Sequence, residues 1–199
     1  MEKFKKIETM KEAYLQTKAK YIELATKTGF EFKVNINRSR HGDSFTNDIT
    51  ILNGGESNKF IAKIINDNAA LLVTKVKGLA TAQLTDFKDT YQDSYLAYKN
   101  AVDNDTPIPD ATSKLLDEFK ELRNSLAPIS EMTTFEAEAT QEGFTINGFS
   151  VFNNLLVTVL NDNLALVESK YKKEVQSEFT AYETALKKDA QELIVEINK

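Results

Sequence analysis

Cysteine is absent from the 199-residue sequence, histidine occurs once, and proline and glycine are scarce at three and seven. Without cysteine the chain cannot form a disulfide scaffold, a thiolate zinc site or a thiol nucleophile. A single histidine is too few for the metal motifs that use a pair of them. We therefore expect no metal and no other cofactor.

Long apolar runs are also missing, since the richest one, Leu155–Leu160, has six residues and includes Thr158. A membrane-spanning helix needs about 20 apolar residues, so we predict none. The N-terminal segment carries charges where a signal peptide has its apolar stretch. Together these observations predict a cytoplasmic or otherwise intracellular protein without membrane contact.

The apolar residues that are present suffice for a core. Leu, Ile, Val and Phe together supply 54 residues, or 27 % of the chain, well above the level typical of disordered proteins. The net charge is −5 and the pI about 5.1. An acidic protein of this kind is not expected to bind nucleic acid through its phosphates.

The charge is unevenly distributed along the chain. Residues 1–40 hold eight Lys and two Arg against five Glu, a net of +5. Residues 86–118 hold eight acidic residues against three Lys, a net of −5. These segments are either two solvated helix faces or a basic and an acidic end that meet, within one chain or between neighbours.

An internal repeat divides the chain. Residues 58–72 align with 153–167 at an offset of 95, with six of fifteen positions identical. Upstream, Gly29-Phe30 matches Gly143-Phe144 at an offset of 114. The change of offset predicts 19 extra residues in the first half. Such self-similarity indicates two copies of one structural unit.

Apolar residues downstream of the match recur every eleven positions, as in Leu164, Val175, Leu186 and Ile197. Eleven residues over three turns fit a nearly undistorted α-helix. We therefore predict a mainly α, α+β protein: an antiparallel helical bundle with small β-hairpins, built from a duplicated helix, β-excursion and long helix. The expected segments are a first repeat over 1–102 (helix 2–28, β-excursion 29–57, long helix 58–102), a linker over 103–110, and a second repeat over 111–199 (helix 111–142, hairpin 143–152, long helix 153–198).

The segments 59–68 and 154–163 permit two interpretations. Their β-branched residues would suit strands, but the apolar spacing is helical, and we favour helices. On that interpretation Asn68 and Asn163 lie at equivalent places on the apolar stripes. A buried Asn at such a place can set the register of paired helices, whereas the simpler alternative makes both ordinary turn residues.

The residues present only in the first half carry the candidate binding site. Arg38, Arg40 and His41 lie together there, and arginine forks match phosphates and carboxylates. We expect residues 37–57 to project from the helical body, so that a short Asn-Gly turn could replace them with little loss of helix. Catalysis by His41 with Asp43 is disfavoured by their spacing.

Three functions remain open. The first is a non-enzymatic structural or assembly protein that acts through helix–helix packing, with a protein partner or a second copy of itself, for instance in a virus particle. The second is a binding module that recognises an anionic ligand or partner through Arg38, Arg40 and His41. The third is an enzyme whose carboxylates assemble from distant segments. We favour the first, and expect no catalytic residues.

Overall fold

The computed structural model describes residues 2–38, 45–146 and 150–198. Within these residues the protein is mainly helical, with one antiparallel four-stranded sheet. The described helices are α1 (Glu2–Thr26), α2 (Asn58–Asp67), α3 (Ala69–Asp103), α4 (Asp110–Glu131), α5 (Ser150–Asp162) and α6 (Leu164–Ile197), with a 3-10 turn, η1 (Gly55–Ser57), before α2. The strands are β1 (Glu31–Arg38), β2 (Phe45–Leu52), β3 (Ala137–Ala139) and β4 (Gly143–Ile146).

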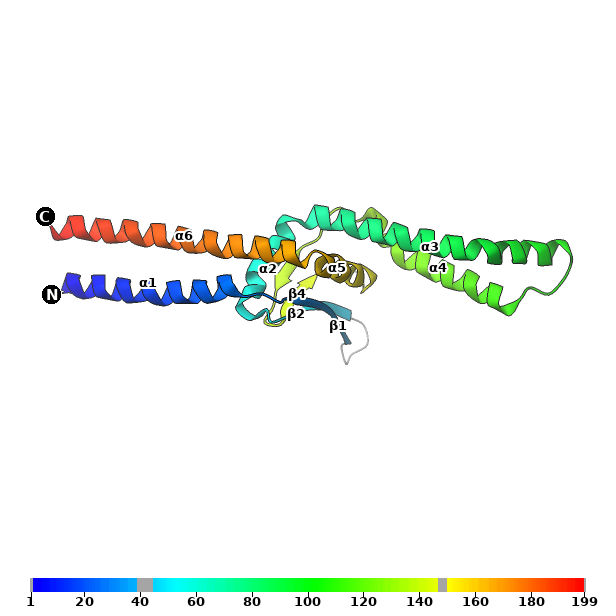
Figure 1. The fold of residues 1–199 in the computed structure, drawn as a ribbon, viewed down its shortest axis with the longest axis horizontal. Coiled ribbons are helices and arrows are strands. Elements are labelled where there is room, and N and C mark those ends of the chain that lie inside the picture. The colour runs from blue at the N-terminus through cyan, green and yellow to red at the C-terminus, as the bar shows by residue number, and fades with distance from the viewer. Residues whose placement is uncertain (1, 39–44, 147–149, 199) are drawn as a thin grey trace.

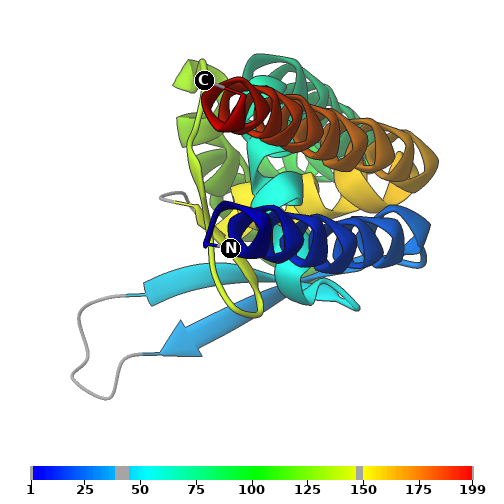
Figure 2. The same ribbon diagram turned by 90° about the vertical axis from the view of Figure 1, so that its left-hand side faces the viewer.

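The molecule is elongated, with a central body and two arms that extend in opposite directions (Figure 1). We call α1 and α6 the terminal arm, because it carries both chain ends, and α3 and α4 the hairpin arm. Figure 2 views the terminal arm end-on and shows its two helices side by side. The long helices form two antiparallel pairs, because α1 packs against α6 and α3 against α4, and the expected antiparallel bundle is not confirmed.

The sheet lies at the centre with the strand order β1-β2-β4-β3. Its middle ladder pairs Ile49 of β2 with Phe144 of β4. These side chains and Phe32 of β1 are buried, whereas Glu31 and Lys33 on the alternate face are exposed. The apolar face of the sheet packs against α2 and α5. This face and the apolar sides of the two helices therefore form one core.

Each predicted long helix is broken once, at Asn68 between α2 and α3 and at Asn163 between α5 and α6. The side-chain amide of each donates to the carbonyl four residues earlier, at 2.6 Å to Ile64 O and 2.7 Å to Val159 O. This local bond competes with the backbone ladder and ends the first helix. The prediction of one unbroken helix over 58–102 and another over 153–198 was therefore wrong. The segments that permitted two interpretations, 59–68 and 154–163, are helical up to Asp67 and Asp162.

Two further expectations for the second half were wrong. The helix predicted over 111–142 ends at Glu131, where Met132 turns to an extended conformation. The hairpin predicted over 143–152 does not form, since β4 pairs with β3 and β2 while α5 already begins at Ser150. Residues 147–149, which hold the predicted Asn-Gly turn, lie outside the described part of the chain.

The β-excursion of the first half belongs to the core. Ile49 and Ile51 are only 1 % and 3 % exposed, and β2 lies between β1 and β4. The expectation that residues 37–57 as a whole project from the body and are dispensable was therefore wrong. Residues 39–44, at the centre of that segment, lie outside the described part.

Hydrogen bonds in the two halves correspond in pairs. Asn161 joins the edge of β1 through two bonds of 3.0 Å, accepting from Phe32 N and donating to Phe32 O. Asn66 makes the same two bonds to Ala137 of β3, at 2.7 and 2.9 Å. The asparagines are 95 residues apart and their partners 105. The sequence match of Gly29-Phe30 with Gly143-Phe144, at an offset of 114 residues, has no counterpart in these hydrogen bonds. Phe144 instead lies opposite Ile49 in the sheet.

The bridge from Asn161 should contribute measurably to stability. Asn161→Ala removes the hydrogen-bond partners of both the backbone N–H and the carbonyl of Phe32. We expect it to lower the free energy of unfolding by about 2 kcal/mol. Asn161→Asp should not rescue it, because a carboxylate cannot donate to Phe32 O. Asn154→Ala, at an exposed position in α5, is the control. Equal denaturant midpoints for Asn161→Ala and the parent would contradict this role.

Candidate functional site

The terminal arm is closely packed near the sheet. The ring of Phe179 lies between those of Tyr21 and Tyr14, with centroids 5.4 and 6.2 Å away. Deeper still, the hydroxyl of the buried Tyr171 donates to Leu24 O at 2.8 Å. These contacts fix the register of α1 along α6.

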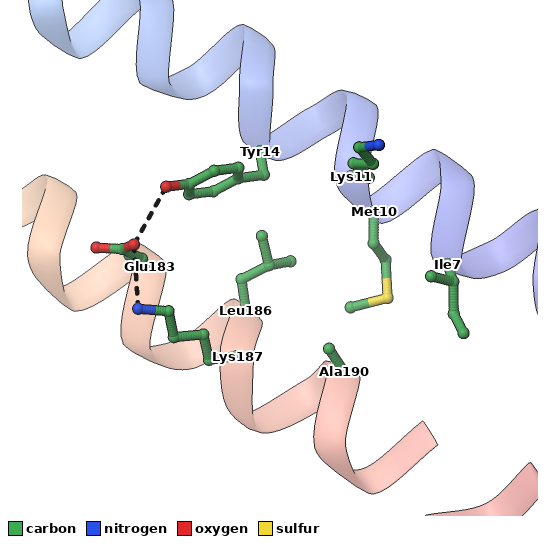
Figure 3. Close-up of a pocket in the computed structure, with 8 residues that line it drawn as sticks. All are labelled: Ile7, Met10, Lys11, Tyr14, Glu183, Leu186, Lys187 and Ala190. Carbon is green, nitrogen blue, oxygen red and sulfur yellow. Dashed lines mark hydrogen bonds and ion pairs between the residues drawn. The ribbon is translucent and has the colours of Figure 1, made fainter. Parts of the chain in front are cut away.

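Further toward the chain ends the same helix pair leaves a cleft of about 290 Å³. Its apolar lining comes from Ile7, Met10, Tyr14, Leu186 and Ala190, and its polar lining from Lys11, Glu183 and Lys187. Figure 3 shows side chains of both helices directed into the space between them. We call this the basic cleft.

The hairpin arm offers a comparison for the cleft. There Tyr91 stacks on Phe119 at 5.3 Å and 11°, and Tyr95 lies beside Tyr91 at 6.0 Å. At the sequence offsets of 95 and 105, Tyr91, Tyr95 and Phe119 align with Leu186, Ala190 and Tyr14 of the terminal arm. The terminal arm thus carries the smaller Leu and Ala side chains where its cleft lies.

The polar rim is held by Glu183, whose Oε1 accepts from Tyr14 OH at 3.1 Å and lies 3.1 Å from Lys187 Nζ. Both contacts, the one from Lys187 foremost, lower the pKa of the Glu183 carboxyl. Lys18 lies over the Tyr14 ring, 5.9 Å from its centroid. With Lys11 and Lys187, this gives the rim three cations against one carboxylate.

A second cleft, the acidic cleft, shares Met10 and Leu186 with the first. Its volume is about 530 Å³, and its charged lining is Lys6, Asp189, Glu192 and Glu196. The terminal arm therefore separates charge between two clefts that share part of their apolar floor.

Exposed apolar side chains also lie along α1. Phe4, Leu15 and Ile22 are each more than half exposed. Their spacings of eleven and seven residues place them on one side of the helix. Lys11, which lines the basic cleft, lies between Phe4 and Leu15 on that side.

Of the site residues predicted from the sequence, the structure brings Asn68 and Asn163 together, since both line one small cleft. Arg38 ends β1, and Arg40 and His41 lie outside the described residues, so their anion-binding role stays a prediction. Asn68 accepts a hydrogen bond from Lys170, and Asn163 accepts one from Lys75. Both lie at helix breaks, and their role in setting register also stays a prediction.

Compared with protein-family models, curated proteins and solved structures, the chain matches none of them. None of the described helices combines the length and apolar character of a transmembrane span. Across residues 2–38, 45–146 and 150–198, no three His, Cys, Asp or Glu side chains are grouped to hold a metal ion.

Tyr21 provides a spectroscopic test of the arm packing. Burial, together with the hydrogen bond that its hydroxyl donates to Glu178 Oε1 at 2.9 Å, raises its pKa to about 12. Because this lies above the unfolded value of about 10, the resulting stability is complete below pH ~10 and is lost as the pH rises toward 12.

We expect Tyr21→Phe to reduce the late step of the alkaline absorbance titration and to flatten this decline in stability, while Tyr171, whose pKa is also raised by burial, still titrates late. Tyr95→Phe, at a half-exposed site on the hairpin arm, should leave both unchanged. A late step of undiminished amplitude in Tyr21→Phe would show that Tyr21 does not contribute to it.

Proposed function

We propose that this chain is a non-enzymatic structural or assembly protein that binds protein partners, or further copies of itself, through its two helical arms. The position of the exposed apolar side chains carries the proposal. Within the described residues, all of the large ones except Ile108 lie on the arm helices: Phe4, Leu15 and Ile22 on α1, Leu71, Tyr95, Leu96 and Val102 on α3, and Leu166, Ile194 and Val195 on α6.

Clustered exposed apolar side chains are typical of interaction surfaces. A two-helix pair also covers only one side of each helix, so its outer sides are available to further helices. The arms extend away from the sheet in opposite directions (Figure 1). A partner could therefore contact either arm without disturbing the central body.

We further propose that the chain is internally duplicated. The strand order β1-β2-β4-β3 is unchanged when the halves are exchanged, and the Asn66 and Asn161 bridges correspond. Each arm combines one helix from each half. These features support an ancestral two-fold dimer whose subunits became joined by the segment between α3 and α4.

Photo-crosslinking in the cells that express the protein tests the assembly function. A photoreactive residue at Leu15 or Leu96 should give covalent adducts with protein, whether another copy or a different chain. The same residue at Glu138, exposed on β3, is the matched control and should give none. Adducts from Glu138 alone, or from no position, would overturn the proposal.

A further inference from the structure

We propose that copies of this chain associate head to tail, with the end of the hairpin arm of one molecule seated in the basic cleft of the next. This association rests on the assembly function proposed above and names its partner as a second copy. The seated element is the acidic tip, residues 86–118, which comprises the end of α3, the connection and the start of α4.

The positions of the charged segments favour contact between neighbours. The acidic tip forms one extreme of the molecule, and the lysine-rich α1 runs to the opposite extreme, where both termini lie (Figure 1). Within one elongated chain these two ends cannot meet. A contact between them therefore requires a second molecule.

The acidic tip presents apolar groups among its carboxylates. Leu96 is 51 % exposed, and Tyr95, Val102 and Ile108 are also exposed. Asp89, Asp93 and Asp103 lie seven and three residues before Leu96 and seven after it. These spacings place the three acids on the Leu96 side of α3. Leu96 therefore lies among carboxylates on one side of α3.

The basic cleft is complementary in shape and charge. Its floor is apolar and concave, and its rim carries Lys11, Lys18 and Lys187. Of these, only Lys187 forms an ion pair within the described part of the chain. The acidic cleft would repel the tip, so charge selects one of the two clefts. Burial of Leu96 would supply the affinity.

Such an interface joins two different surfaces and does not close on itself, so it generates open chains of molecules. Oppositely charged rims also make it sensitive to salt. The average mass of the parent protein should therefore rise with concentration in sedimentation velocity, and fall when salt is added.

Two complementary variants test the geometry. The tip variant carries Asp93→Lys and Leu96→Lys and retains its cleft. The cleft variant carries Lys11→Glu and Ala190→Tyr, whose larger side chain fills the cleft, and retains its tip. Leu71→Lys is the control, because Leu71 is as exposed as Leu96, at 52 %, but lies on neither surface. Circular dichroism confirms that each variant is folded.

Self-association of each variant alone should be at least tenfold weaker than that of the parent, so that each is monomeric. An equimolar mixture of the two should form a one-to-one dimer and nothing larger. The Leu71→Lys control should associate like the parent. Self-association of the tip variant would indicate that two terminal arms pair with each other, and would overturn the proposal. A mixture that stays monomeric, or a Leu71→Lys protein that does, would overturn it as well.

A parent protein that is monomeric at every concentration would also overturn head-to-tail association. The assembly function would still stand if Leu15 and Leu96 then crosslinked to a different protein in cells. The assembly function would fail only if the crosslinking experiment also gave no adducts from Leu15 or Leu96. The failure of one proposal can therefore be told from the failure of the other.

Discussion

Cut between Asp105 and Thr106, the chain should remain a one-to-one complex of residues 1–105 and 106–199, and neither half should fold as a monomer. The reason is that the halves are intertwined. Each arm takes one helix from each half, and the central ladder pairs β2 of the first with β4 of the second. A separated half would expose its core faces, and isolated helices are marginal in water.

Co-expression of the two halves and their separate expression test this expectation. The co-purified pair should reproduce the circular dichroism and cooperative melting of the intact chain, whereas each half alone should lose cooperative melting. The intact chain with a protease site in the same connection, cut after folding, is the control for the break itself. A half that melted cooperatively as a monomer would contradict the intertwined arrangement.

Local signals in the sequence predicted the elements that depend on local physics. Apolar residues three and four positions apart, such as Ile7, Met10 and Tyr14, predict the first helix over 2–28, and α1 runs from Glu2 to Thr26. The alternation of apolar Phe32 with charged Glu31 and Lys33 predicts a strand, which β1 confirms, and residues 59–67 are helical as the apolar spacing indicated. In these segments the periodicity of the backbone decides the outcome.

The missed features depend on contacts between distant residues. Residues 143–146 pair with β2 and with β3, and no local turn signal reports that choice of partners. The basic cleft was missed because Met10 and Tyr14 lie on a stripe that resembles core. Whether such a stripe encloses a void depends on residues such as Ala190, which is 180 positions away from Met10.

Replacing residues 37–57 by a short Asn-Gly turn should unfold the protein. This reverses the expectation from the sequence, because the deletion removes β2 from the middle of the sheet. Ile49 and Ile51 are almost completely buried, and truncation of one such side chain costs about 2–5 kcal/mol. Total stabilities are about 5–15 kcal/mol, so the loss of both with the β2 ladders exceeds what the fold can tolerate.

A matched shortening separates the strand from the excess length. Val34 and Asp48 are separated by thirteen residues, whereas Ala139 and Gly143, in the second hairpin, are separated by three, Thr140-Gln141-Glu142. Replacing residues 35–47 by Thr-Gln-Glu keeps Ile49 and Ile51 in place. We expect cooperative melting with a midpoint shifted by roughly 2–4 °C for each kcal/mol lost. Because β3 and β4 are joined by so short a turn, the first hairpin should close in the same way. If the 37–57 replacement melted cooperatively while this variant did not, β2 would not be the central strand of the core.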